Sequence, residues 1–378
     1  MGSKLDKAFA DIDKELGKGI VQDASTAEDV KRLVSRSMGM NYIFNGGTPR
    51  GRIIELYGPE SGGKSLLATT VAVDFQRAGE FVVYIDLEGT FISEFSERLG
   101  LSVDPKQFRL LQPETGEDAF ESIEMLAKTG EVGYIIVDSV AAMIPKSELE
   151  GDYGESSVGT MARLMSQGMR KLNSIVRKSN TTVLFINQIR QKIGVTYGSP
   201  ETTTGGNSLK FYASSRNRIS RKDTLKDGKD VVGIQMGVTN KKSKIGPPLR
   251  EFTTNVYFEN GIDMDTELAD FGAKLEVLTK SGSWYDMPDG ERIQGKTNVS
   301  KYLSENPETR KRVFKEIYQR LFGFEPDWAP TGAEATPTNK VDTEESSESE
   351  TPKKRKSSKK AKEPEIEIEV PVDDGDEV

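Results

Sequence analysis

The stretch GPESGGKS, at residues 58–65, constrains the fold of this 378-residue chain more than any other. It follows the apolar run RIIELYG and opens a helical pattern at 65–78, the context that the phosphate-binding pattern G-x-x-x-x-G-K-[ST] requires. Glycines in such a loop let backbone N–H groups surround phosphate oxygens, and the helix N-terminus adds a partial positive charge. The stretch therefore predicts a nucleotide-binding loop made of Gly58, Pro59, Glu60, Ser61, Gly62, Gly63, Lys64 and Ser65.

Three oxygen or nitrogen donors are predicted to complete this site. We expect Lys64 to reach the β- and γ-phosphates of ATP and the Ser65 hydroxyl to coordinate Mg²⁺. Asp138 ends the apolar run YIIVDS, and a carboxylate at the C-terminal edge of a buried strand can hold Mg²⁺ or its waters. An Asp at such a position can also cap a helix, but the phosphate loop favours the metal role. ATP and Mg²⁺ are the predicted cofactors.

The sequence contains no histidine, so a carboxylate has to serve as the general base for any hydrolysis. Glu88 ends the run FVVYIDLE and could activate the attacking water. Asp86 lies two residues earlier in the same run, and alternation along a strand lets both side chains face one way. Spacing alone therefore leaves both carboxylates open.

The body of the chain alternates short apolar runs with helical patterns. The runs are β-branched and nearly continuous, which is typical of parallel strands covered on both faces. Their residue ranges are 52–58, 81–88, 134–139 and 182–188, and the helical patterns cover 65–78, 117–129 and 160–178. This order predicts an α/β fold with a mostly parallel, doubly wound central sheet. Before it we expect an amphipathic helix at 3–17 and a second helix near 27–38, and after it a small mixed module at 266–324.

Charge and composition indicate a disordered tail and limit the cellular location of the protein. The net charge of −8 arises entirely from residues 325–378, which hold 16 acidic and 8 basic residues. Such a segment is expected to be disordered, either as a solubilising tail or as one that competes with an anionic ligand. The chain has no cysteine, which suits a reducing cytosol, and no apolar run nears the roughly 20 residues that span a bilayer. We therefore expect a cytoplasmic protein without a membrane segment.

Several longer blocks carry a family resemblance. They read GPESGGKS, DSVAAMIPKSELEGDYGE, MARLMSQGMRKL, FINQIRQKIGV, GSPETTTGGNSLKFYAS and NPETR. With them the chain resembles the bacterial and phage RecA recombinase family over roughly residues 5–323. The resemblance implies an ATP- and Mg²⁺-dependent protein that polymerises on single-stranded DNA and catalyses homologous pairing and strand exchange. It also implies that Glu88 is the catalytic glutamate, and that Phe95, a tyrosine in the family, stacks on adenine.

The resemblance implies a DNA-binding role for two loops. Residues 150–159 match the family's first DNA-binding loop, and IRQKIGVTYGSPETTTGGNS at 189–208 matches the second. The chemistry agrees, because glycines allow a phosphate chain to approach, and exposed amides, threonines and basic side chains contact phosphate without reading bases. The predicted DNA-binding residues are Arg163, Ser166, Arg170, Arg190, Tyr197, Thr204, Gly205, Gly206 and Asn207.

Three further residues are expected to link subunits or ligands. Gln188 ends the run TVLFINQ beside the nucleotide and begins the DNA loop, so it could couple ATP state to DNA affinity, although it could instead only satisfy strand-end carbonyls. The resemblance places Lys242 and Lys244 against the ATP of the neighbouring subunit. The helix at 3–17 matches the family's packing arm. The predicted catalytic residues are Glu88, Lys64, Gln188, Lys242 and Lys244.

The predicted domains are an N-terminal oligomerisation arm (1–38), a RecA-like ATPase core with the DNA-binding loops (39–262), a small C-terminal domain (263–324) and a disordered charged tail (325–378). The leading expectation is a DNA-dependent ATPase that forms helical filaments and acts on single-stranded and duplex DNA without sequence preference. A ring-forming helicase on the same core would share the phosphate loop but need no PETTTGGN loop. A mediator that uses the nucleotide only as a clamp would need no complete set of Lys64, Ser65, Glu88 and Asp138.

Overall fold

The structure is a computed structural model that describes residues 3–17, 20–21, 30–152, 159–191 and 201–328. Its helices are α1 (Lys4–Leu16), α2 (Met38–Ile43), α3 (Lys64–Arg77), α4 (Ser93–Arg98), α5 (Gly116–Thr129), α6 (Lys146–Leu149), α7 (Thr160–Ser179), α8 (Ser208–Tyr212), α9 (Met264–Lys274), α10 (Lys296–Glu305) and α11 (Pro307–Phe322). Its strands are β1 (Arg32–Leu33), β2 (Thr48–Pro49), β3 (Ile53–Gly58), β4 (Phe81–Asp86), β5 (Phe108–Leu111), β6 (Val132–Asp138), β7 (Thr182–Gln191), β8 (Glu201–Thr203), β9 (Ser215–Asp227), β10 (Asp230–Ser243), β11 (Glu251–Tyr257), β12 (Gly261–Ile262), β13 (Thr279–Ser281), β14 (Trp284–Asp286) and β15 (Arg292–Gln294).

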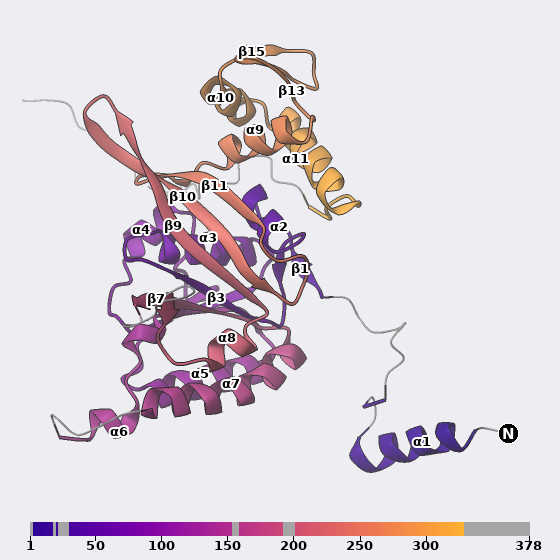
Figure 1. The fold of residues 1–378 in the computed structure, drawn as a ribbon, viewed down its shortest axis with the longest axis vertical. Helices are drawn as coiled ribbons and strands as arrows, with labels where there is room; N and C mark the ends of the chain where they lie inside the picture. Colours follow the sequence, from indigo (N-terminus) through magenta and orange to yellow (C-terminus); the bar gives the residue numbers. More distant parts are fainter. Residues whose placement is uncertain (1–2, 18–19, 22–29, 153–158, 192–200, 329–378) are drawn as a thin grey trace, which may run out of the picture. The chain divides into compact units, whose positions relative to one another are not determined.

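One sheet organises the core, in the order β12-β11-β10-β9-β3-β7-β6-β4-β5, with β8 paired to β7 (Figure 1). The strands from β9 to β5 run parallel, which confirms the predicted mostly parallel α/β fold. Strands β9 to β12 form an antiparallel extension that the sequence patterns did not predict. The carboxyl ends of β3, β4, β6 and β7 therefore meet at one edge, where a ligand site is expected.

Side chains alternate between two hydrophobic clusters along the parallel strands. Ile54 and Leu56 of β3 join the cluster that packs on α3, whereas Ile53 joins the cluster that packs on α5 and α7. In Figure 1, α3 lies on one side of the sheet, and α5 and α7 lie together on the other. Burial on both faces explains why these strands are apolar throughout. The helices predicted at 65–78, 117–129 and 160–178 are confirmed as α3, α5 and α7.

The helix predicted near 27–38 is wrong where the structure describes it. Residues 30–37 contain no helix and include β1, and the helix begins only at Met38, capped by the Ser37 side chain. The reason is a buried ion pair in which Arg36 Nε donates to Asp74 Oδ1 at 2.8 Å, while the Ser35 hydroxyl donates to Asp74 Oδ2 at 2.6 Å. These contacts fix the segment along α3 rather than in its own helix.

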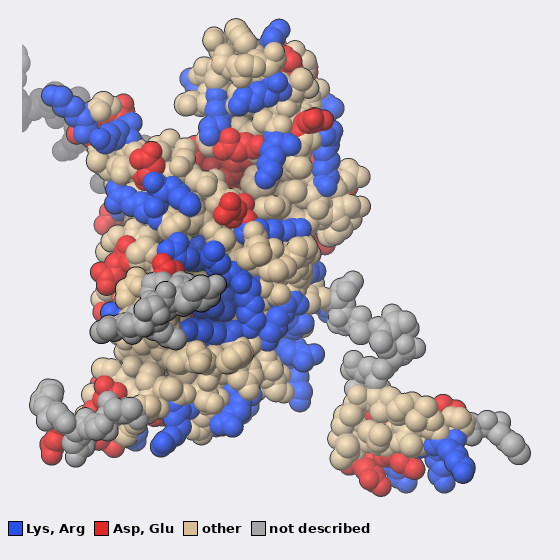
Figure 2. Space-filling view, viewed as in Figure 1, with Lys and Arg blue, Asp and Glu red and all other residues tan. Residues whose placement is uncertain are grey.

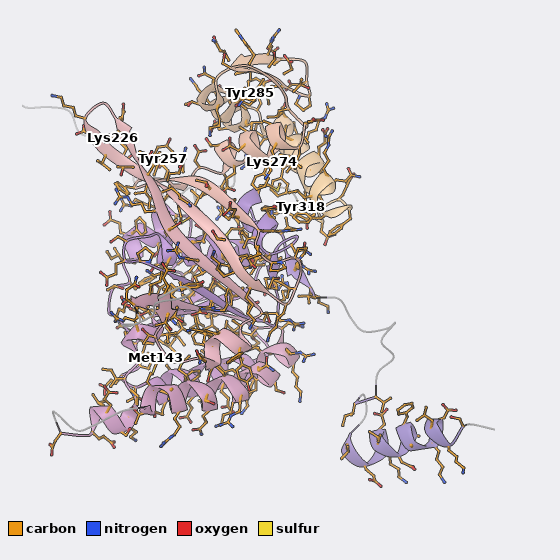
Figure 3. All side chains as sticks on the ribbon, in the orientation of Figure 1. Met143, Lys226, Tyr257, Lys274, Tyr285 and Tyr318 are labelled. Carbon is orange, nitrogen blue, oxygen red and sulfur yellow. The ribbon has the colours of Figure 1, made fainter. Side chains whose placement is uncertain are left out.

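The small module after the sheet contains α9 to α11 and the antiparallel sheet β13-β14-β15. Tyr318, labelled on α11 in Figure 3, is buried. Its hydroxyl donates to the carbonyl oxygen of Gly46 at 2.7 Å. The segment α1 forms as predicted, and its apolar residues Leu5, Phe9, Ile12 and Leu16 are exposed. Within the described residues, no helix is both long enough and apolar enough to span a membrane. The residue boundaries of the four domains stay a prediction.

Candidate nucleotide and DNA-binding site

The phosphate loop lies between the end of β3 and the start of α3. Its backbone adopts positive φ at Ser61 (54°) and Gly63 (91°). Gly58 is required by packing as well, because a Cβ there would lie 2.4 Å from the carbonyl oxygen of Ile219 in β9. The loop thus has the strand–turn–helix context that the sequence predicts, with free N–H groups at the start of a helix of 14 residues.

Lys64 lies folded back over this loop. Its Nζ donates to the carbonyl oxygens of Pro59 at 2.7 Å and Gly58 at 3.3 Å, and the residue is only 9% exposed. Burial lowers the pKa of Lys64, and the carboxylates of Asp138, Glu88 and Glu60 act in the opposite direction. The amine therefore lies inside the loop that would surround the phosphates.

Asp138 and Ser65 are brought together as predicted. The Ser65 hydroxyl donates to Asp138 Oδ2 at 2.7 Å, and the Tyr84 hydroxyl donates to the same oxygen at 2.6 Å. Burial raises the pKa of Asp138, while these two hydrogen bonds act to lower it. A hydroxyl and a carboxylate oxygen at this spacing are the hard ligands that Mg²⁺ prefers, so these residues fit the ion.

The two candidate bases have different surroundings. Asp86 is 2% exposed, and it accepts hydrogen bonds from the backbone N–H groups of Thr90 (3.2 Å) and Phe91 (3.0 Å), so it holds the turn after β4. Glu88 is exposed, and its Oε1 accepts from the hydroxyl of Ser139 and from Gln188 Nε2 at 3.4 Å. Glu88 thus has an accessible carboxylate beside the phosphate loop, whereas the carboxylate of Asp86 is occupied by hydrogen bonds from backbone N–H groups.

Gln188 lies directly beside the loop, because its register partner across β3 and β7 is Gly58. Beyond it, β7 continues to Gln191 and pairs antiparallel with β8, with Ile189 opposite Thr203. Asn187 Nδ2 also donates to the carbonyl oxygen of Thr204 at 3.0 Å. The ends of the expected loose loop are therefore strand-paired, and its centre at 192–200, with Tyr197, lies outside the described residues.

The other predicted DNA-binding residues lie on α7, at the end of β7 and after β8. Gly205 (φ 84°) and Gly206 (φ 73°) turn the chain against α7, where added Cβ atoms would lie 3.1 Å from Met165 and 3.2 Å from Ala162. Arg163, Arg170, Arg190 and Asn207 are exposed, Ser166 and Thr204 are half-buried, and the Arg170 Nε donates to the Ser166 carbonyl at 3.2 Å. Close packing against α7 thus explains why glycine is found at both positions, whether or not DNA also approaches them.

Phe95 lies on α4, seven residues after Glu88 in the chain. Its ring is half-buried, with the guanidinium carbon of Arg98 5.7 Å from the ring centroid. A partly exposed aromatic ring is compatible with stacking on a base.

Lys242 and Lys244 lie apart from the phosphate loop of their own chain. Lys242 is opposite Arg216 of β9, which is opposite Glu55 of β3, three residues before Gly58. At the usual spacings within a sheet, Lys242 therefore lies about 10 Å from the loop along the strand direction and about 10 Å from it across the strands. The Nζ atoms of both lysines donate to the Phe211 carbonyl, at 2.8 Å and 2.6 Å.

These lysines belong to a basic region around the start of β9 and the end of β10. It borders a hollow of about 530 Å³ lined by Tyr57, Glu201, Thr202, Thr203, Lys210, Arg216, Arg218 and Lys241. Figure 2 shows Lys and Arg side chains gathered in the middle of this face. Arg216 is held by the buried carboxylate of Glu55 and lies over the Tyr57 ring. Burial, together with Lys244 and Arg216, lowers the pKa of Lys242 to about 8.

Sequence reasoning missed Tyr84, Ser139 and Arg216. Tyr84 lies inside an apolar run and reads as a core residue, and no pattern indicates that its hydroxyl reaches Asp138. Ser139 carried one signal, since it directly follows Asp138 at a strand end. Arg216 lies in a strand that was not predicted.

A phosphate loop at the carboxyl edge of a mostly parallel sheet, with a carboxylate beside its serine, defines a P-loop ATPase core. Residues 3–263 match the model of the RecA N-terminal domain, and residues 266–321 match that of the RecA C-terminal domain. The chain is 45% identical to Protein RecA of Colwellia psychrerythraea (82% of this chain, 90% of the relative) and 43% identical to that of Campylobacter jejuni (85% and 94%). It is 41% identical to Protein RecA of Legionella pneumophila, covering 84% of this chain and 92% of the relative.

The chain belongs to the RecA family. It is a DNA-dependent ATPase of homologous recombination and DNA repair, and like its family it binds DNA and forms filaments. Among solved structures, the RadB recombinase is similar over 61% of this chain and 98% of its own, with 21% identity and a TM-score of 0.47.

Proposed function

We propose that this protein forms helical filaments on single-stranded DNA, hydrolyses ATP with Mg²⁺, and exchanges strands with homologous duplex DNA regardless of sequence. The observation that carries the proposal is the convergence of Lys64, Ser65, Glu88 and Asp138 at one edge of the sheet, with Gln188 joining this edge to the β7–β8 segment. We place this activity in the cytoplasm, which suits a chain without cysteine.

Each residue has one role in hydrolysis. The loop N–H groups and Lys64 bind the phosphates and stabilise the charge that develops on transfer. Ser65 and Asp138 would hold Mg²⁺, which neutralises charge on the phosphate oxygens when bound. Glu88 orients and deprotonates the attacking water, since its carboxylate is exposed while Asp86 is engaged with backbone N–H groups. Phe95 stacks on the adenine.

Gln188 couples the nucleotide to DNA. Its amide contacts Glu88 on one side, and its backbone leads within one residue into the β7–β8 pairing on the other. A γ-phosphate that attracted this amide would move the start of the DNA-binding segment. Arg163, Ser166, Arg170, Arg190 and residues 204–207 would then contact DNA phosphates, with Tyr197 in the part of the loop outside the described residues.

Lys242 and Lys244 act on the ATP of the adjacent subunit. Their distance from the chain's own loop along the register, together with the basic region around them, supports action in trans. Positive charge supplied by a neighbour stabilises the phosphoryl-transfer transition state, as an arginine finger does. The exposed apolar face of α1 would pack on a neighbouring copy.

Electron microscopy with a slowly hydrolysed ATP analogue and single-stranded DNA tests this proposal, together with an assay of strand exchange onto homologous duplex. Helical filaments that exchange strands are expected. Closed rings that unwind duplex DNA without exchange would contradict the proposal and support the helicase alternative.

A further inference from the structure

The hydroxyl of Tyr84 reaches the carboxylate of Asp138 from inside the protein. Tyr84 lies in β4, is 3% exposed, and its Oη donates to Asp138 Oδ2 at 2.6 Å. The same oxygen accepts from the Ser65 hydroxyl at 2.7 Å. One carboxylate oxygen thus accepts hydrogen bonds from two hydroxyl groups, one in the phosphate loop and one in the core.

The ring of Tyr84 is fixed by aromatic packing. Its centroid lies 5.0 Å from that of Phe91, which in turn stacks on Phe108 at 5.5 Å. The backbone N–H of Phe91 is bound by Asp86 at 3.0 Å. These ring contacts hold the Tyr84 side chain in place from within the core.

Two further hydrogen bonds join the same two strand ends. The Leu87 N–H donates to the Asp138 carbonyl at 2.7 Å, and the Ser139 hydroxyl donates to the Glu88 carboxylate. Tyr84 adds the contact that fixes the side chain of Asp138 rather than its backbone. The ends of β4 and β6, which carry the candidate base and the candidate metal residue, are thereby held as one unit.

We propose that Tyr84 is a positioning residue whose hydroxyl holds the Asp138 carboxylate in the orientation that Mg²⁺ binding requires. This inference rests on the proposed metal role of Asp138. Ser65 cannot perform the same task alone, since its oxygen would itself turn toward the ion. Hydrogen bonds that orient a metal ligand from behind typically change metal affinity about 10- to 100-fold when they are removed.

Tyr84→Phe removes only the hydroxyl and keeps the ring contacts. Tyr134→Phe is the matched control, because Tyr134 is fully buried on the adjacent strand β6 and its hydroxyl donates to the backbone carbonyl of Ala68, at 3.4 Å, rather than to a residue of the site. The measurement is the affinity for a fluorescent ATP analogue, in EDTA and over a series of Mg²⁺ concentrations. For Tyr84→Phe we expect unchanged affinity in EDTA and a Mg²⁺ midpoint raised about tenfold or more. The control should match the wild type.

A double-mutant comparison checks that Tyr84 acts through Asp138. The Mg²⁺ response of Tyr84→Phe/Asp138→Asn should equal that of Asp138→Asn alone, because the hydroxyl has lost the carboxylate that it positions. Additive losses, or a Tyr84→Phe midpoint equal to that of the wild type, would overturn the inference and leave the proposed function standing. Wild-type binding that ignores Mg²⁺ would overturn the metal role itself.

Discussion

We expect a buried carboxyl between the sheet and the C-terminal module to make the stability of this protein depend on pH. Glu267 of α9 is 1% exposed, and its Oε2 accepts hydrogen bonds from the Ser37 hydroxyl at 2.7 Å and the Gly39 N–H at 3.1 Å. These contacts join α9 to the start of α2. Burial raises the pKa of Glu267 from 4.5 to about 7, and the nearby Asp263 carboxylate acts in the same direction.

The size of the effect follows from the shift in pKa. Between pH 4.5 and about 7 the folded protein keeps a proton on Glu267 that the unfolded chain has released, so the free energy of unfolding falls as pH rises through this window. At 1.36 kcal/mol per unit of pKa, the loss is about 3 kcal/mol. Glu267→Gln removes the titration while keeping the shape of the side chain, and so removes this loss.

Urea unfolding of the wild type and of Glu267→Gln, at about pH 5 and about pH 8, measures this pH-dependent loss in the free energy of unfolding. Relative to the wild type, the variant should gain up to about 3 kcal/mol between the two pH values, because any constant penalty of the amide cancels. Glu259→Gln, at an exposed turn after β11, makes the same charge change and should show no such gain. An equal difference between Glu267→Gln and the wild type at both pH values would refute the reasoning.

Four further predictions concern the site. Lys64→Ala should reduce ATP hydrolysis at least about 10²-fold in a steady-state assay, because the lost charge stabilises the transferred phosphoryl group; activity near wild type would contradict its role. Gln188→Ala should keep nucleotide affinity but remove the difference in single-stranded DNA affinity between an ATP analogue and ADP, and a full wild-type difference would contradict the coupling. DNA-stimulated hydrolysis should decline above about pH 8 as Lys242 loses its proton, with bound phosphates moving the midpoint upward, and Lys242→Arg should retain activity to higher pH; identical pH profiles would contradict this. Removing residues 341–378, which carry 13 acidic and 7 basic groups, should tighten DNA binding most at low salt if the tail competes with DNA, whereas an unchanged salt dependence would favour a solubilising tail.

The parallel half of the fold was predictable because each of its strands and helices has a recognisable pattern in its own short stretch of sequence. Strands β3, β4, β6 and β7 are buried on both faces and so appear as apolar runs, with amphipathic helices between them. Strands β9 and β10 were missed because much of their length is polar and partly exposed, and their pairing depends on long-range register. The segment before α2 was misread because Asp74, far along the chain, fixes it.

The arrangement of the candidate site was predictable where a motif fixes the backbone conformation. The phosphate loop, Ser65 and Asp138 lie as expected, because strand order brings carboxyl ends to one edge. The choice between Asp86 and Glu88 could not come from spacing, since only the structure shows that the Asp86 carboxylate is used by the Thr90 and Phe91 N–H groups. The hydrogen bond from Tyr84 to Asp138 could not be predicted, because it joins side chains of two different strands.

The central claim, that each active site is shared between neighbouring subunits, is tested most directly by mixing two inactive variants. Glu88→Gln should bind ATP but not activate water, and Lys242→Ala/Lys244→Ala should bind ATP but lack charge in trans. In filaments shown to contain both proteins, interfaces that join intact lysines to an intact Glu88 re-form complete sites. Hydrolysis by the mixture should therefore clearly exceed the average of the two variants alone. A mixture no more active than that average would contradict a shared site.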